Sequence, residues 1–141
     1  MPIRCEIVSQ DRIVYQGPAD IVVLPGADGV MGILPNHSPV LTTLQFGVIT
    51  VRFQGKEQYF TVAGGVAEVQ PDQVTVLADA AENVDEINLR RAEEAKRRAE
   101  EMMSKVPPTD TDEYLKLQAA LRRSKLRIEA AHRYRQRRSS S

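Results

Sequence analysis

Residues 66–77 have the sequence VAEVQPDQVTVL, in which two short apolar runs flank a turn sequence. The turn is Gln70–Gln73, and its Pro71 has a backbone angle φ already fixed near the value that the second position of a tight turn requires. In the second run, Val74 and Val76 alternate with a polar threonine, which is the period of two typical of a half-buried β-strand. This stretch is therefore predicted to form a β-hairpin.

A second hairpin precedes the first in the chain. Residues 49–54 alternate between apolar and polar side chains, and the turn sequence Gln54–Glu57 then leads into the apolar run 58–62. Five more apolar runs are separated by glycine, proline, asparagine and aspartate, which favour turns. Short strands at this spacing are typical of a β-sandwich or a β-barrel. The five runs are residues 3–8, 13–15, 21–24, 30–34 and 40–44.

The carboxy-terminal part of the chain has a different composition. All eight glycines lie at or before Gly65, so few turn signals remain beyond it. Asp85 or Asn83 is expected to cap a helix that runs to about Lys105, because short polar side chains accept hydrogen bonds from the amides of a first helical turn. Pro107 ends this helix, since proline cannot continue it.

A second helix is expected over residues 112–137, with Asp110 and Glu113 forming its capping box. Two helices joined by a short loop make a helical hairpin. The sequence therefore predicts two domains: a β-sandwich over residues 1–84 and a helical hairpin over residues 85–141.

The first predicted helix carries a stripe of mostly small side chains. Burying a methyl group contributes only about 0.8 kcal/mol, against about 1.5 to 3 kcal/mol for a whole leucine or isoleucine. A hairpin packed through such a stripe is a movable element, and a permanently docked hairpin is the alternative that the pattern leaves open. The stripe consists of Ala92, Ala95, Ala99, Met102 and Val106.

Basic and acidic residues, 19 of each, are separated along the chain. Residues 1–84 hold four basic residues against nine acidic ones, a balance of −5, whereas residues 113–138 hold nine against two, a balance of +7. The second helix therefore attracts an acidic surface on a protein, a nucleic acid or a lipid. A nucleic-acid-binding β-sandwich with a basic helical tail is the alternative function, although Tyr114 and Tyr134 are that helix's only aromatic residues for base stacking.

Catalytic and metal chemistry find little support in the sequence. His37 and His132 are the only histidines, neither has a second histidine or cysteine at ligand spacing, and no nucleophile elbow or phosphate-binding loop is present. The single cysteine, Cys5, cannot form an intramolecular disulfide, which is typical of a cytoplasmic protein. No apolar run approaches about 20 residues, so no membrane insertion is expected. We expect no catalytic residue, no metal site and no required cofactor.

Three segments together resemble one known family: residues 32–41 (GILPNHSPVL), 62–69 (VAGGVAEV) and 74–79 (VTVLAD). With the basic last helix, their order is similar to that of the epsilon subunits of F-type ATP synthases. The resemblance implies a β-sandwich of about ten short strands in two sheets, which binds the gamma subunit and rests on the c-ring, followed by a regulatory α-helical hairpin. It also implies a non-catalytic rotor subunit of the central stalk, peripheral to the cytoplasmic face of a bacterial cell membrane, without a nucleic-acid partner.

The resemblance also assigns surfaces to partner subunits. Residues in the position of the family's c-ring contact are Asp28, Val30, Met31 and His37, although Val30 stands where some relatives carry an acidic residue. The hairpin of the family can extend along gamma to the alpha and beta subunits and restrain ATP hydrolysis. The residues that would then face acidic segments of the beta subunits are Arg122, Arg123, Lys125, Arg127 and Arg133.

Some bacterial members bind ATP on the folded hairpin, as a regulatory ligand, through a motif that this chain matches in part. Asn88 replaces the aspartate of that motif and offers only a neutral acceptor. Two arginines on one helical face can grip phosphates with forked donors, whereas the favoured alternative is an ordinary ion pair of Arg98 with Glu94 one turn earlier. The residues in positions of the ATP site are Glu82, Ile87, Asn88, Arg91, Ala92 and Arg98.

Overall fold

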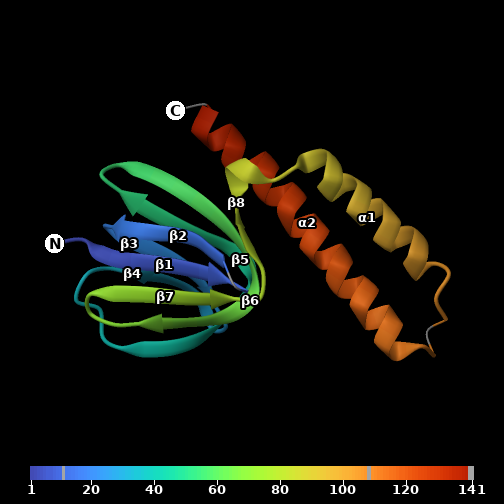
Figure 1. Ribbon diagram of the computed structural model, residues 1–141, viewed down its shortest axis with the longest axis horizontal. Helices are drawn as coiled ribbons and strands as arrows, with labels where there is room; N and C mark the ends of the chain where they lie inside the picture. Colours follow the sequence, from blue (N-terminus) through green and yellow to red (C-terminus); the bar gives the residue numbers. More distant parts are fainter. Residues whose placement is uncertain (11, 108, 140–141) are drawn as a thin grey trace. The chain divides into compact units, whose positions relative to one another are not determined.

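The structure is a computed structural model that describes residues 1–10, 12–107 and 109–139, with side chains through Arg135 (Figure 1). The chain divides into two compact units. We call Met1–Val84 the strand unit and Asp85–Ser141 the helical unit. The strands are β1 (Ile3–Ser9), β2 (Arg12–Ala19), β3 (Ile21–Gly26), β4 (Gly29–Ile33), β5 (Val40–Phe53), β6 (Lys56–Val69), β7 (Gln73–Ala78) and β8 (Ala81–Asn83).

Hydrogen bonds place the strands in the order β2-β1-β7-β6-β5-β3-β4, with β8 also paired to β6. The β1–β7 pair is parallel, and the other pairs are antiparallel. Because β6 is 14 residues long, its Gly65–Val69 half pairs with β7 while Phe60–Val62 pairs with β8. The ring of Tyr15 on β2 packs on that of Phe60 with centroids 5.3 Å apart, which joins the two layers of the sandwich.

Both predicted hairpins are present, and the β-sandwich is confirmed, with its described strands hydrogen-bonded into one eight-stranded sheet where about ten strands in two sheets were expected. Gln70 and Gln73 exchange two backbone hydrogen bonds across the β6–β7 turn, and β5 pairs with β6 along their whole length. The two longest strands each contain two of the predicted apolar runs. Strand β5 contains runs 40–44 and 49–53, and β6 contains runs 58–62 and 66–69. Eight strands result in the described part of the chain, one of which, β8, sequence reasoning missed.

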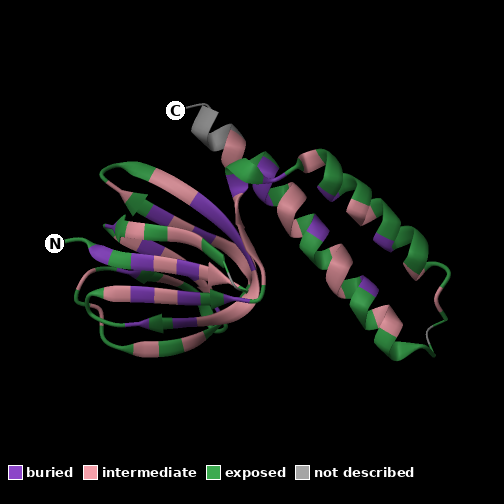
Figure 2. Ribbon diagram, viewed as in Figure 1, coloured by how far each residue is buried: buried purple, intermediate pink, exposed green. Residues whose placement is uncertain are grey.

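Inward-facing side chains fill the space between the layers. Figure 2 shows buried positions alternating with more exposed ones along the strands. Phe60, Ile7 and Leu24 are among the fully buried side chains, each of which contributes about 1.5 to 3 kcal/mol on burial. Cys5 lies in the same core, where burial, with a smaller effect of the neighbouring Glu6, raises the pKa of its thiol to about 12. The cysteine therefore acts as a small apolar core residue.

The helical unit contains α1 (Leu89–Met103) and α2 (Thr111–Ser139), which lie side by side as the predicted helical hairpin (Figure 1). Asp110 caps α2 as expected, since its Oδ1 accepts a hydrogen bond of 3.3 Å from the backbone N–H of Glu113. This bond is slightly longer than the usual range of about 2.7 to 3.2 Å for N–H···O bonds.

The start of α1 differs from the prediction that Asp85 or Asn83 caps it. Asn83 ends β8, and Asp85 lies within a short 3-10 helix, Val84–Glu86. The cap is Asn88, whose Oδ1 accepts a hydrogen bond of 3.0 Å from the backbone N–H of Arg91. The prediction was wrong by about one turn because the 3-10 helix takes up the residues that carried the capping signal.

Small side chains form most of the seam between the helices, as the stripe predicts. Ala92 and Ala99 are buried on α1, and Leu117 and Ala131 are buried on α2 (Figure 2). Met102 is 46% exposed, so the stripe does not extend to it. A seam of this composition contributes little apolar free energy per contact.

Candidate interaction surfaces

The hairpin of β3 and β4 carries three of the four residues predicted to contact the c-ring. Asp28 lies exposed in the turn, and Val30, the second residue of β4, is 79% exposed. Met31 is half-buried and packs against the sandwich core, where its side chain covers Gly26. Met31 therefore supports the turn, while Asp28 and Val30 present a carboxylate and an apolar tip to solvent.

His37, the fourth of these residues, lies in the separate loop between β4 and β5. Its Nδ1–H donates to the backbone carbonyl of Ser38 at 2.7 Å. The neighbouring Asn36 adopts a positive φ of 68° and donates its backbone N–H to the carbonyl of Pro71 at 2.8 Å. The loop is thus tied to the β6–β7 turn, and His37 shapes it locally.

Five of the six predicted ATP-site residues lie in the helical unit, and Glu82 lies in β8 of the strand unit. Asn88, in the position of the motif aspartate, uses its side-chain oxygen to cap α1. Arg91 is exposed, whereas Ala92 is fully buried. The motif positions therefore have different roles. Asn88 caps α1 and Ala92 packs in the seam between the helices, whereas Arg91 is accessible to solvent.

Arg98 follows Arg91 by two helical turns and is also exposed. It lines an open depression of about 350 Å³ together with Glu94, Arg97 and Glu101. Glu94 pairs with Arg90 at 3.4 Å instead of with Arg98, which corrects the predicted ion pair. The charges of this depression are evenly divided between two carboxylates and two guanidinium groups.

The predicted cationic residues of α2 are mostly exposed. Helical spacing places Arg122 and Arg133 opposite the buried Leu117, Ser124 and Ala131, with Arg123 and Lys125 to either side and Arg127 nearer to the buried residues. Arg133 lies over the ring of Tyr134, with its guanidinium carbon 5.5 Å from the ring centre. Among these residues, Arg122, Arg123, Lys125 and Arg133 are exposed and Arg127 is half-buried.

An apolar row on the outer face of the sheet was missed by sequence reasoning. Register pairs Val8 with both Ile13 and Leu77, and Leu77 in turn with Val66. Ile13 and Leu77 are 55% and 54% exposed, and the two valines are half-buried. We call Ile13, Val8, Leu77 and Val66 the outer row. The sequence gives one signal of this row. Apolar and polar side chains stop alternating at Leu77, an apolar residue directly after the buried Val76.

Acidic residues flank the outer row on the same face. Two positions along each strand from Val8 and Val66 lie Glu6 and Glu68, which share the outer face because side chains alternate in a strand. Asp79 lies two positions beyond Leu77, with its carboxylate against Gly64. An apolar strip with an acidic border fits a partner whose apolar stripe has a basic border.

Arg135 makes a contact that links the two ends of the helical unit. Its guanidinium donates to the backbone carbonyl of Ile87, 48 residues earlier in the chain. Ile87 is buried and directly precedes the cap residue Asn88. Sequence reasoning also missed this contact. No local pattern in the sequence predicts that a side chain at the end of α2 bonds a carbonyl 48 residues earlier.

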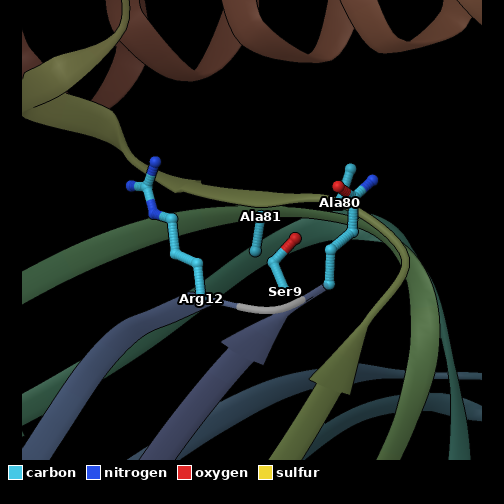
Figure 3. Close-up of a pocket in the computed structure, with 5 residues that line it drawn as sticks. Ser9, Arg12, Ala80 and Ala81 are labelled. Atoms are coloured by element: carbon cyan, nitrogen blue, oxygen red, sulfur yellow. The ribbon is translucent and has the colours of Figure 1, made fainter.

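A further depression of about 370 Å³ lies at the β1–β2 turn of the strand unit. Figure 3 shows Ser9 and Arg12 on one side of it and Ala80 and Ala81 on the other. Of the residues that line it, Arg12 is the one with a charge, so the lining offers no acid–base pair for catalysis.

Metal-binding clusters and membrane-spanning helices are absent from the part of the chain that the structure describes. Among these residues, no three or more histidine, cysteine, aspartate or glutamate side chains gather in a way that could hold a metal ion. None of the helices described is both long and apolar enough to span a membrane.

Known proteins match the chain over nearly its whole length. The family model described as ATP synthase, Delta/Epsilon chain, beta-sandwich domain matches residues 2–84, and the long alpha-helix domain of the same family matches residues 85–132. Curated relatives named ATP synthase epsilon chain include that of Dehalococcoides mccartyi strain BAV1, 40% identical over 94% of both chains. That of Herpetosiphon aurantiacus is 40% identical over 93% of this chain and 95% of its own.

Solved structures show the same fold. A chain in the Euglena gracilis mitochondrial ATP synthase, in an OSCP/F1/c-ring structure, superposes with a TM-score of 0.74 at 22% identity, covering 92% of this chain and 81% of its own. The domain order, the sequence relatives and the fold confirm the predicted resemblance. This chain belongs to the ATP synthase Delta/Epsilon chain family.

Proposed function

We propose that this chain is a non-catalytic subunit of the central stalk of an F-type ATP synthase, where it couples rotation of the c-ring to the catalytic head. The observation that carries the proposal is the match of both family domains, in order, over residues 2–132. Its named relatives are ATP synthase epsilon chains of similar length. We further propose that it is peripheral, at the cytoplasmic face of a bacterial cell membrane.

The strand unit is proposed to dock on the gamma subunit through the outer row. Two side chains of this row are more than half exposed. Contact of apolar side chains with water is unfavourable, and burial against a partner surface removes it. The acidic border supplied by Glu6 and Glu68 selects a gamma surface with basic flanks. The β3–β4 turn is then proposed as the c-ring contact, through Val30 and the Asp28 carboxylate.

The helical unit is proposed to be the regulatory part. Its alanine-rich seam contributes little to holding the hairpin folded, and the exposed cations of α2 favour an acidic surface of the alpha and beta subunits. Several charge pairs formed together can supply the roughly 5.5 kcal/mol that reverses a population from 1:99 to 99:1. An extended hairpin would thereby restrain ATP hydrolysis.

Truncation before Pro107 in the assembled synthase tests the regulatory part. The shortened chain keeps the strand unit and α1 but lacks α2. We expect ATP hydrolysis to rise under conditions in which the parent enzyme is restrained, with the complex remaining assembled. Unchanged hydrolysis would remove the inhibitory function and leave the coupling function standing. Loss of the chain from the complex would instead point to α2 as an assembly element.

ATP is proposed as a regulatory ligand of the folded hairpin. The exposed Arg91 and Arg98 lie on one side of α1, and both supply forked donors suited to phosphates. Titration of the full chain with ATP, followed by calorimetry, should give saturable heat that Arg91→Ala abolishes. An equal response of parent and variant, or no heat at millimolar ATP, would remove the nucleotide from the mechanism.

A further inference from the structure

The depression at the β1–β2 turn has no part in the proposed function. It is lined by Ser9, Gln10 and Arg12 on one side and by Ala80 and Ala81 on the other, and we call it the β1–β2 depression. Its volume of about 370 Å³ is near the lower end of the range of about 300 to 1,000 Å³ that is typical of small-molecule sites. Its size therefore suits a small ligand.

Strand register brings polar side chains together on one wall of the β1–β2 depression. Ser9, the last residue of β1, pairs directly with Arg12, the first residue of β2. Directly opposed side chains lie on the same side of a ladder, with their Cβ atoms about 4.5 to 5.5 Å apart. Figure 3 shows both side chains extending from this ladder toward the strand that carries Ala81. A hydroxyl and a guanidinium therefore line one space, together with the amide of Gln10.

The opposite wall is apolar and is held in place by β6. Ala81 pairs with Val62 and packs against the sandwich core. The carbonyl of Ala80 accepts a hydrogen bond of 2.9 Å from the backbone N–H of Ala63. Both alanines are thus fixed to β6, and this wall offers apolar surface without a charge.

The lining favours an anion, because it contains hydrogen-bond donors and a positive charge but no carboxylate. A phosphate monoester has three strong acceptor oxygens, which match the guanidinium fork, the hydroxyl and the amide group, whereas a carboxylate has two. Arg12 also has a further interaction. A guanidinium has five N–H donors, enough for that partner and a phosphate at once.

We propose that the β1–β2 depression binds a small phosphate monoester. The phosphate contacts Arg12 and Ser9, and a short carbon chain covers Ala80 and Ala81. This inference goes beyond the stalk function and does not depend on it. The same phosphate group occurs on soluble metabolites and on phosphatidic acid, so the experiment includes both sources.

Titration of the ¹⁵N-labelled full chain with glycerol 3-phosphate, followed by NMR, tests the site. Chloride keeps the ionic strength constant, so that charge screening does not change with the ligand. We expect the backbone amide signals of Ser9, Gln10 and Ala81 to shift and to saturate at millimolar ligand. Glycerol, which lacks the phosphate, should shift none of them. Shifts that do not saturate, or that glycerol reproduces, would overturn the proposal.

Arg12→Gln is expected to weaken binding of glycerol 3-phosphate at least about tenfold, the range for a lost charge-assisted hydrogen bond. The matched control is Arg4→Gln, which removes the same charge from the second residue of β1, outside the lining of the depression. It should bind as the parent does. Equal affinities of the two variants would show that the ligand does not bind at Arg12.

If Arg12→Gln loses the dispersed NMR spectrum of the folded parent, Ser9→Ala decides instead. It removes only a hydroxyl from a half-buried side chain and should weaken binding about threefold. An affinity equal to that of the parent would then contradict the site.

Co-sedimentation with phosphatidic acid vesicles identifies the source of the phosphate. If the parent sediments with the vesicles and Arg12→Gln does not, the ligand is a lipid headgroup. If the parent binds glycerol 3-phosphate but not the vesicles, the ligand is a soluble metabolite. Equal sedimentation of both chains would exclude the lipid as a ligand of this site. Because no other synthase subunit takes part, failure of the phosphate site leaves the proposed stalk function intact.

Discussion

Gly65 allows strand β6 to continue where the sequence predicts a break. Glycines at 64 and 65 suggest a break between two strands, yet β6 continues through both. Gly65 has φ of 134°, and a Cβ built on it would lie 2.3 Å from the carbonyl oxygen of Leu77. The close approach of β7 therefore needs a residue without a side chain, and the same site lets β6 bend between layers.

We expect Gly65→Ala to lower the free energy of unfolding by at least about 2 kcal/mol, since it combines backbone strain with a clash against backbone atoms. Urea unfolding of the full chain measures it. Gly32→Ala is the control, because its Cβ would meet only the Ile21 side chain at 3.5 Å, an ordinary contact. Similar losses in both variants would contradict the account of Gly65.

At the scale of elements, the start of α1 depends on Asn88. The 3-10 helix before it takes up Asp85, so the first-turn amides of α1 rely on the Asn88 side chain. Asparagine and aspartate are almost equally good caps, whereas alanine has no acceptor. Asn88 therefore supports the helix start as well as an aspartate would, without a charge.

Asn88→Ala should lower the protection of the Arg91 amide against hydrogen exchange about fivefold, which corresponds to a cap of about 1 kcal/mol. Asn88→Asp, the control, should keep the protection of the parent. Mass spectrometry or NMR of the exchanging chain measures both. If Asn88→Asp exchanges as fast as Asn88→Ala, the hydrogen bond from Arg91 does not set the helix start.

For the whole molecule, charge and exposed apolar surface divide between the two units. The strand unit carries −5 and presents the outer row, whereas residues 113–138 carry +7. Opposite charges on one chain suit partners of opposite sign, reached by different parts of the molecule. This division is the physical basis of the proposed function, in which the strand unit anchors the chain and the helical unit regulates.

Leu77→Glu should weaken binding of the chain to isolated gamma subunit about thirtyfold or more, the scale of a central interface residue. Val30→Glu makes the same chemical change at an exposed apolar residue outside the outer row, so it should bind as the parent does. Surface plasmon resonance measures both, after thermal unfolding has shown intact folds. Comparable weakening by the two variants would place the gamma contact elsewhere on the strand unit.

The sequence by itself determined the elements whose causes lie within a few residues. The turns at Pro71 and Gly55, the cap at Asp110 and the alanine stripe of α1 act through neighbours along the chain, and all are present in the structure. The family resemblance could also be recognised from the sequence, because the motifs that carry it are continuous segments.

Only the tertiary structure decided which distant residues meet. The outer row exists because strand register aligns Ile13, Val8 and Leu77, and the parallel β1–β7 pairing behind it leaves no local signal. The bond from Arg135 to the Ile87 carbonyl spans 48 residues and depends on the lengths of both helices and the loop between them. Such contacts come from the packing of whole elements, whose relative positions no short stretch of sequence specifies.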